Sequence, residues 1–183
     1  MQAARGASLT SDPGPTKNLS RTRLLLGVAA CFWAVDLISK EIAEHKLLGR
    51  DPIEVLGPLL RLNLTRNPGA AFSTGSGLTP LISLVAVAAL LVVLYLALRV
   101  RSTVWAWALG LLLAGIAGNL TDRLFREPGP LRGHVVDFLE LPNWPIFNVA
   151  DVCINVAAAL IVIQSLRGIR LDGRRIEEKE TAG

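Results

Sequence analysis

The sequence predicts an all-α membrane protein with four transmembrane helices and a small extracytoplasmic subdomain of sheet and loop. Composition is the first reason, because 51% of the 183 residues are hydrophobic and only 19% are charged, which is too apolar for a soluble domain of this length. The second reason is that four apolar stretches approach the roughly 20 residues a helix needs to cross a bilayer. Two longer segments between these stretches mix proline, glycine and charge with short apolar runs.

The four predicted spans differ in how regular they are. They cover residues 24–42, 78–98, 104–120 and 146–166. The second span is the clearest, because it contains no charged residue over a length that is unusual for a buried soluble helix. The first is the least regular, since Asp36 and Lys40 interrupt it. These two charges must face protein or water rather than lipid.

The segments outside the spans are predicted from their composition. Residues 1–20 are rich in Gly, Ser, Thr and Pro and are predicted to be a disordered cytoplasmic extension. Residues 21–168 form the predicted transmembrane domain, and residues 169–183 form a charged, solvated cytoplasmic tail. The outer segment 46–77 contains the apolar run from Val55 to Leu64 and is a candidate for a small sheet on the membrane surface.

Lys and Arg in the short flanks predict the orientation in the membrane. They collect before the first span, between the second and third, and after the fourth, with fewer on the other side. The bias is moderate, and it places both termini in the cytoplasm. The sequence pI of about 9.6 is then explained by cytoplasmic flanks in contact with anionic lipid. No basic patch interleaved with aromatic residues points to nucleic acid.

The two cysteines, Cys31 and Cys153, both fall in predicted spans. They offer neither a disulfide framework nor a thiol cluster for a metal. The run from Val28 to Cys31 follows a basic start and a short apolar stretch, as a lipoprotein's own cleavage site does, which would make this chain a substrate. The apolar run continues past Cys31, and cleavage there would remove half of a span. We therefore favour a small core residue at this position.

Polar residues at membrane depth are the candidates for function, because each is costly in hydrocarbon unless it is paired. Asp36 and Lys40 have the spacing of an ion pair on one helical face, so a purely structural role is an open alternative. The segment from Asn67 to Phe72 precedes the second span. Its small residues, Gly69 among them, let the backbone approach another surface, and Asn67 offers donor and acceptor. An ordinary turn is the alternative there.

The outer end of the third span carries a second polar group. Helical spacing places Asn119, Asp122 and Arg123 on one face, which indicates a polar interior. A helix end whose Arg123 reaches out to the interface is the alternative. The segment that follows contains Asp137, framed by apolar residues and close to the membrane. An ordinary loop aspartate usually has polar neighbours.

The fourth span begins with a third polar group. Asn148, Asp151 and Asn155 follow helical spacing on one face, although Asp151 also has a structural explanation as an N-terminal cap. Asp137 and Asp151 thus come from different elements at one membrane depth, with no His or Cys cluster that argues for a metal. Two carboxyl groups held close share one proton, so one acts as base and the other as acid. The pair predicts acid–base hydrolysis.

Five motifs taken in order resemble the motif set of the signal peptidase II family, the lipoprotein signal peptidases. Each motif alone would be weak, but five in this order on a four-span scaffold are specific. The resemblance extends from about residue 24 to residue 166. The motifs are Asp36 with Lys40, Asn67 to Phe72, Gly118-Asn119 with Asp122-Arg123, Val136-Asp137-Phe138, and Phe147-Asn148 with Ala150-Asp151.

The resemblance implies a membrane aspartic endopeptidase of the bacterial cytoplasmic membrane, with its active site near the outer leaflet. Asp137 and Asp151 would be the catalytic dyad, cutting a prelipoprotein just before its diacylglyceryl-modified cysteine. It implies that the enzyme needs no cofactor and no metal. It also implies a monomer whose partners are membrane lipids and prelipoproteins.

The resemblance also implies roles for the remaining polar residues. One set would line the site and hold the substrate or the dyad, and a second would brace the helices around it. The substrate-binding set is Asn67, Gly69, Asn119, Arg123 and Asn148. The bracing set is Asp36, Lys40 and Asp122.

Two other classes of function stay open. A small transporter or channel would place ionisable residues along a polar path across the membrane, and the second span offers none. In an assembly factor the polar residues would only hold helices together. Its function would survive carboxamides in place of Asp137 and Asp151.

Overall fold

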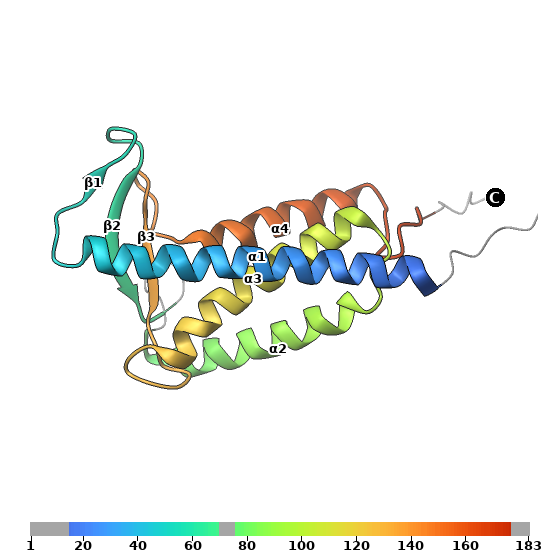
Figure 1. Cartoon of the computed structure of the whole chain (residues 1–183), viewed down its shortest axis with the longest axis horizontal. Coiled ribbons are helices and arrows are strands. Elements are labelled where there is room, and N and C mark those ends of the chain that lie inside the picture. The colour runs from blue at the N-terminus through green and yellow to red at the C-terminus, as the bar shows by residue number, and fades with distance from the viewer. Residues whose placement is uncertain (1–14, 70–75, 177–183) are drawn as a thin grey trace, which may run out of the picture.

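The computed structural model describes residues 15–69 and 76–176 of the chain. Its helices are α1 (Pro15–Leu47), the short 3-10 turn η2 (Ser76–Leu78), α2 (Thr79–Ala97), α3 (Thr103–Phe125) and α4 (Val149–Leu166). Its strands are β1 (Ile53–Glu54), β2 (Arg61–Asn67) and β3 (Val135–Glu140). Figure 1 shows the long helices running beside one another, with the strands across one end of the bundle.

All four long helices of the described chain have the length and apolar character needed to cross a membrane. The candidate spans are Ser20–Leu47, Thr79–Ala97, Thr103–Phe125 and Val149–Leu166. Each overlaps one predicted span, and with the small sheet they confirm the predicted fold class. The start of α1, the connection from α2 to α3 and the end of α4 lie at the end of the bundle away from the sheet (Figure 1).

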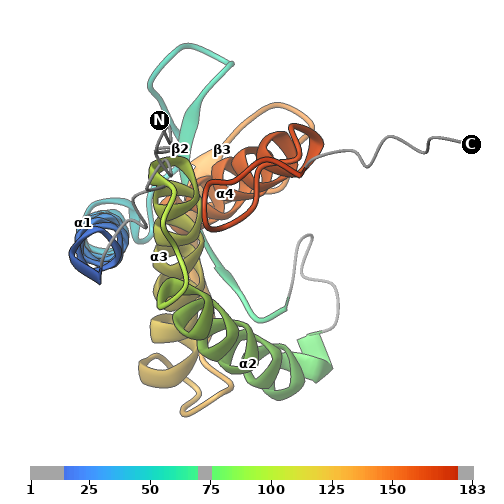
Figure 2. The same ribbon diagram turned by 90° about the vertical axis from the view of Figure 1, so that its right-hand side faces the viewer.

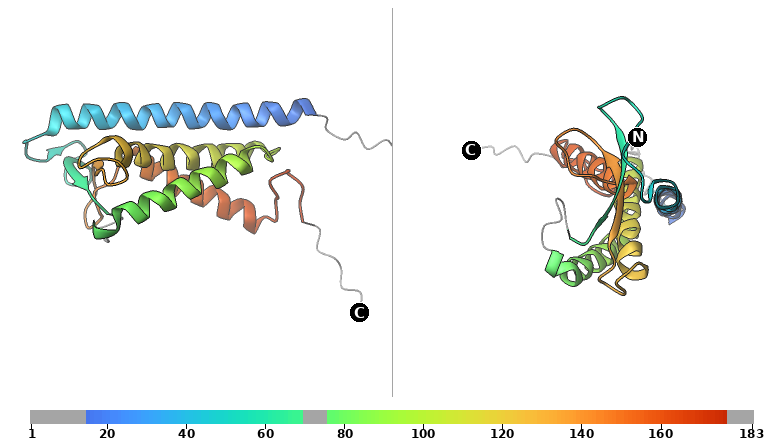
Figure 3. Two further views of the ribbon diagram at one scale, coloured as in Figure 1. Left: turned by 90° about the horizontal axis from the view of Figure 1, so that it is seen from below. Right: turned by 90° about the vertical axis from the view of Figure 1, so that its left-hand side faces the viewer.

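Helix α3 is the centre of the bundle, with α1 on one side and α2 and α4 on the other (Figures 2 and 3). Glycines in α3 allow the close approach of its neighbours, as small residues do in membrane helices. A methyl group on Gly115 would come within 2.5 Å of the Ala150 carbonyl oxygen on α4. A methyl group on Gly118 would overlap the Asp36 carboxylate of α1. Both helices are thereby held against the half of α3 nearer the sheet.

The strands form one antiparallel sheet in the order β1-β2-β3. The first outer segment was predicted to hold a small sheet, and it supplies β1 and β2. Strand β3 comes from the second outer segment, where the sequence indicated a loop, and it pairs Thr65 with Asp137 and Asn67 with Val135. Buried apolar residues such as Val136 and Phe138 favour a strand there. The sheet therefore joins both outer segments and places Asn67 beside Asp137.

Helix α1 extends beyond its predicted span of 24–42 at both ends, from Pro15 to Leu47. Two further helix boundaries differ from the prediction for physical reasons. Helix α3 continues to Phe125, past the predicted end at residue 120, because Asp122 and Arg123 are buried against protein and do not end the helix. Helix α4 begins at Val149 rather than 146, because Asn148 caps its first turn.

The predicted terminal segments lie partly outside the described residues. Helix α1 begins at Pro15, inside the predicted extension, while residues 1–14 and 177–183 fall outside the description. Near the C-terminus, the backbone amides of Arg101 and Ser102 donate to the Leu171 carbonyl oxygen at 3.0 and 3.3 Å. The Trp105 indole donates to the Ile169 carbonyl oxygen at 3.0 Å. The first part of the predicted tail thus folds against the start of α3.

Candidate active site

Asp137 lies on β3 and is only 2% exposed. Its Oδ2 accepts a hydrogen bond from the Asn67 side chain at 3.1 Å, and its Oδ1 accepts one from the Asn148 side chain at 2.6 Å. Burial, reinforced by the charge of Asp151, raises the pKa of the Asp137 carboxyl to about 7, although the two amide hydrogen bonds oppose the shift. This carboxyl therefore holds a proton over part of the neutral pH range.

Asp151 is the third residue of α4 and belongs to a capping box. Its backbone amide donates to Asn148 Oδ1 at 2.9 Å, and its Oδ2 accepts from the Asn148 backbone amide at 3.2 Å. The N-cap residue is thus Asn148, with Asp151 as its reciprocal partner. The other oxygen of Asp151, Oδ1, accepts from the Asn119 side chain at 2.8 Å. The structural role of Asp151 uses one of its oxygens and leaves Oδ1 directed at Asn119.

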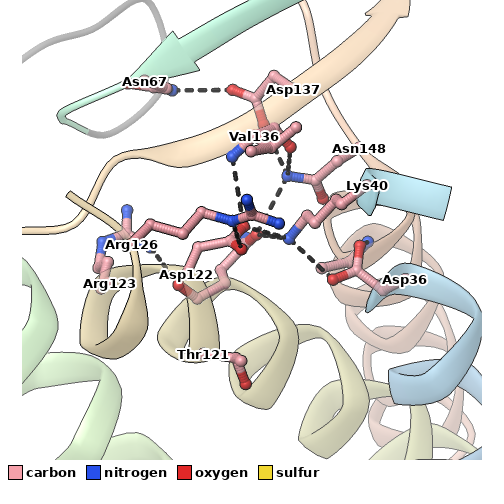
Figure 4. Close-up of polar contacts among 12 residues, drawn as sticks. Asp36, Lys40, Asn67, Thr121, Asp122, Arg123, Arg126, Val136, Asp137 and Asn148 are labelled. Carbon is pink, nitrogen blue, oxygen red and sulfur yellow. Dashed lines mark hydrogen bonds and ion pairs between the residues drawn. The ribbon is translucent and has the colours of Figure 1, made fainter. Parts of the chain in front are cut away.

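Asn148 joins the two carboxyl groups. The same residue donates from its side chain to Asp137 and from its backbone to Asp151, and it is fully buried. Figure 4 shows its side chain between β3 and the helices. The sequence predicted that Asn148 holds the substrate or the dyad, and in the structure it contacts the two carboxyl groups.

The orientation of Asn119 is set by its partners. Its Oδ1 accepts from the Lys40 ammonium and from the Asn148 side chain, both at 3.1 Å. Because an ammonium group can only donate, the oxygen must face Lys40, and the amide nitrogen then points to Asp151. Lys40 thereby fixes which end of Asn119 reaches Asp151.

Lys40 is also the centre of a buried ion cluster (Figure 4). Its Nζ lies 2.8 Å from Asp36 Oδ2 and 2.8 Å from Asp122 Oδ2, and all three side chains are at most 1% exposed. Asp36 Oδ1 accepts from the Ala150 backbone amide at 2.8 Å. The ion pair predicted from spacing is present, and it connects α1, α3 and α4.

Arg123 is 7% exposed, which excludes the alternative that it extends to the interface. One guanidinium nitrogen donates to the Gly69 carbonyl oxygen at 3.0 Å, and another donates to the Asn119 carbonyl oxygen at 3.3 Å. Gly69 is described, whereas residues 70–72 of the same motif lie outside the described residues. Arg123 brings a positive charge to the site of the two carboxyl groups.

A cavity of about 630 Å³ faces both carboxyl groups. Its polar wall is formed by Asn67, Gly69, Asn119, Arg123, Asp137 and Asp151. Its other wall is mainly apolar and includes residues 144–147 and the first turns of α4. The dyad and all predicted substrate-binding residues except Asn148 line it. Within residues 15–69 and 76–176, no group of three His, Cys, Asp or Glu side chains could hold a metal ion.

The sequence model of one family, described as Signal peptidase (SPase) II, matches residues 28–167. The chain belongs to the signal peptidase II family. It is similar to the lipoprotein signal peptidase of Leifsonia xyli subsp. xyli, with 48% identity over 98% of this chain and 86% of that protein. The lipoprotein signal peptidase of Mycobacterium tuberculosis is 42% identical over 95% of this chain and 86% of that protein.

Solved structures of bacterial membrane enzymes show the same fold as this signal peptidase II. One, determined by the in meso method at 2.3 Å resolution, has a TM-score of 0.71 and 27% identity over 85% of this chain and 94% of that chain. A second, at 1.9 Å resolution, has a TM-score of 0.69 and 28% identity over 78% of this chain and 92% of that chain.

Sequence reasoning missed an ion-pair network around Arg126 of this signal peptidase II. Arg126 pairs with Asp122 at 2.6 Å, with Glu41 at 2.7 Å and also with Glu44. Arg66 pairs with Glu44 at 3.0 Å. Only the spacing of Asp122 and Arg126, one helical turn apart, was a usable signal. The other partners lie on different elements, which local spacing does not connect.

The apolar cavity wall was missed as well. Trp144 and the three residues after it line the cavity just before the cap of α4. A tryptophan and apolar neighbours beside Asn148 were a usable signal, since aromatic residues favour the membrane interface.

Proposed function

We propose that Asp137 and Asp151 are the catalytic dyad with which this signal peptidase II removes the signal peptide from prelipoproteins, cutting before the diacylglyceryl-modified cysteine. The observation that carries the proposal is the position of Asn148, which bonds both carboxyl groups at the wall of one cavity. Two carboxyl groups with one proton can activate water without a metal.

The raised pKa of Asp137 supports a division of roles within the dyad. Asp137 starts protonated and donates to the scissile carbonyl oxygen, while anionic Asp151 takes a proton from the attacking water. The water oxygen bonds to the carbonyl carbon, giving a gem-diol intermediate. The carbon–nitrogen bond then breaks as Asp151 returns its proton to the leaving nitrogen and Asp137 recovers one from a hydroxyl of the intermediate.

Asn119 and Arg123 support the proposed site. Asn119 donates to Asp151 Oδ1 and so holds this oxygen at the cavity. Arg123 adds a positive charge near both carboxyl groups while it holds the Gly69 backbone. Both residues line the cavity, so each can contact a substrate peptide.

The surroundings of the cavity support access from the bilayer. Val152 and Val156 of α4 line it and are exposed on the helix surface. An apolar signal peptide and two acyl chains can therefore remain in hydrocarbon while the scissile bond reaches the dyad. The proposal keeps the monomer that the family resemblance implies.

The proposed orientation places the sheet and the site at the outer leaflet of a bacterial cytoplasmic membrane. The exposed arginines Arg99, Arg101, Arg167 and Arg170 gather at the other end of the bundle, between α2 and α3 and after α4. The positive-inside rule assigns that end to the cytoplasm.

The test is cleavage of a diacylglyceryl-modified prelipoprotein by purified Asp137→Asn and Asp151→Asn variants of equal folded yield. We expect each variant to lose about a thousandfold in turnover, the range for a lost acid or base. Asp51→Asn is a matched control, because Asp51 is exposed in the outer segment before β1, and it should cleave at the wild-type rate. Turnover within tenfold of wild type in either dyad variant would refute the proposal.

A further inference from the structure

Asn155 is an amide on α4 that the proposed mechanism does not use. Its side chain is exposed, lines the cavity, and lies between Val152 and Val156 on an otherwise apolar wall. It follows Asp151 by one helical turn, about 6 Å deeper along α4 from the outer end. A carboxamide on a surface in contact with hydrocarbon is costly unless it has a polar partner.

The hydrogen bond that Asn155 makes within the protein uses only part of the hydrogen-bonding capacity of its side chain. Its Nδ2 donates to the Asp151 backbone carbonyl oxygen at 2.9 Å. A carboxamide has two donor hydrogens and an acceptor oxygen, so this contact engages one donor. The same contact turns the amide toward the outer end of α4, where Asp151 borders the cavity.

The substrate class of the proposed function brings suitable acceptors to this depth. Its modified cysteine carries a thioether-linked glyceryl group with two acyl esters. From the cysteine Cα to the nearer ester carbonyl carbon there are six bonds, an extended reach on the order of 8 Å, which is more than the rise of one helical turn. With the cysteine at the dyad, an ester carbonyl can reach the level of Asn155.

The peptide itself is a weaker partner for this amide. A signal peptide that lies in hydrocarbon as a helix satisfies its own carbonyl groups internally. An ester carbonyl has no donor of its own, and in the bilayer core it finds no water.

We propose that Asn155 is a specificity residue that donates a hydrogen bond to an acyl-ester carbonyl of the diacylglyceryl group. The inference rests on the proposed function, since it concerns the same site and the same substrate. Asn155 takes no part in the bond-breaking steps, and its contribution is to binding. Its loss therefore raises KM and leaves kcat close to that of the wild type.

The test uses two synthetic prelipoprotein peptides of identical sequence and chain length. One carries an ester-linked diacylglyceryl cysteine, and the other carries an ether-linked dialkylglyceryl cysteine without the carbonyl groups. We expect the wild-type enzyme to prefer the ester peptide about fivefold in kcat/KM, the size of a net neutral hydrogen bond. Asn155→Leu should lose this preference by a rise in KM for the ester peptide alone.

Ser165→Ala is the matched control for Asn155→Leu. Ser165 is also exposed on α4, and its hydroxyl also donates to the backbone carbonyl one turn earlier, at 2.8 Å, but it does not line the cavity. This variant should keep the wild-type preference. An equal loss on both peptides in Asn155→Leu, or no preference in the wild type, would overturn the inference. A failure of the proposed function is distinguishable, because the dyad variants would then still cleave the ester peptide.

Discussion

The two acidic clusters of this molecule share Asn119 as a neighbour but are stabilised in different ways. Asp36 and Asp122 both bind the Lys40 ammonium and are almost fully enclosed. Asp137 and Asp151 instead accept hydrogen bonds from asparagine groups and face a cavity.

The difference shows that a bundle of membrane helices can use aspartate for two purposes, one structural and one chemical. Paired with a cation in a dry interior, a carboxylate keeps its charge and joins helices. Next to another carboxyl group, where it accepts hydrogen bonds from neutral amides and forms no ion pair, a carboxyl group can share a proton and exchange it with a substrate. Within the described part of the chain, neither Asp137 nor Asp151 forms an ion pair.

Removal of the Lys40 charge should have the largest effect. Lys40→Met leaves the buried Asp36 without a cation, whereas Asp122 keeps Arg126 as a partner. Breaking a buried ion pair costs about 3–5 kcal/mol of the free energy of unfolding. Denaturation in detergent, followed by helix content, measures this loss. Lys46→Met, at an exposed position on the same helix, should leave the stability unchanged. If Lys40→Met were as stable as Lys46→Met, the bracing role of the cluster would be wrong.

Arg123→Ala tests the cluster of Asp137 and Asp151. It removes the positive charge near the dyad, and we expect turnover to fall about a hundredfold, the effect of a lost electrostatic stabiliser. Single-turnover cleavage by the purified variant measures the effect. The exposed Arg132 provides a control as Arg132→Ala, which should retain activity. Equal turnover in Arg123→Ala and wild type would show that Arg123 does not contribute to cleavage.

Gly118→Ala tests the cluster of Asp36, Lys40 and Asp122. The added methyl group would overlap the Asp36 carboxylate, and overpacking of this kind costs about 1–3 kcal/mol. Gly27→Ala is the matched control, since a methyl group there meets no atom within 4 Å and a helical alanine is favoured over glycine. Thermal unfolding of the two variants should shift in opposite directions. A Gly118→Ala variant at least as stable as wild type would show that α3 tolerates a side chain at residue 118.

The pH dependence of cleavage should report the catalytic cluster. The pKa of Asp137 is raised to about 7, so its proton is lost as the pH rises through that value. The rate should then fall about tenfold per pH unit on the alkaline side. The same group favours the folded state at low pH, and this contribution is lost as the pH rises from the unfolded value toward 7. A rate that is constant from pH 6 to 9 would contradict the assignment of Asp137 as the acid.

Local patterns in the sequence predicted much of this architecture. Span lengths gave the four helices, and the spacing of Asp36 and Lys40 predicted their ion pair. Asp137 was singled out as a candidate and lines the cavity, but its place on a strand was not predictable, because β3 pairs with a strand some 70 residues away. Single-sequence periodicity carries no register between distant strands.

The hydrogen bonds that Asn119 and Asn148 make around the two carboxyl groups could not be predicted from the sequence, for the same reason. The link from Lys40 through Asn119 to Asp151 depends on the packing of α1, α3 and α4. The two hydrogen bonds that Asn148 donates to the carboxyl groups depend on where β3 lies relative to the start of α4. Such contacts become visible only when the elements are placed in three dimensions.

The most direct test of the two-cluster account measures stability and cleavage together for Asp137→Asn and Asp36→Asn. The account predicts that Asp137→Asn, which keeps the size of the side chain and breaks no ion pair, is destabilised by about 1 kcal/mol, the centre of the range for point mutants, and yet does not cleave. It predicts that Asp36→Asn loses stability while its folded molecules still cleave. A folded but inactive Asp36→Asn, or an Asp137→Asn that cleaves, would contradict it.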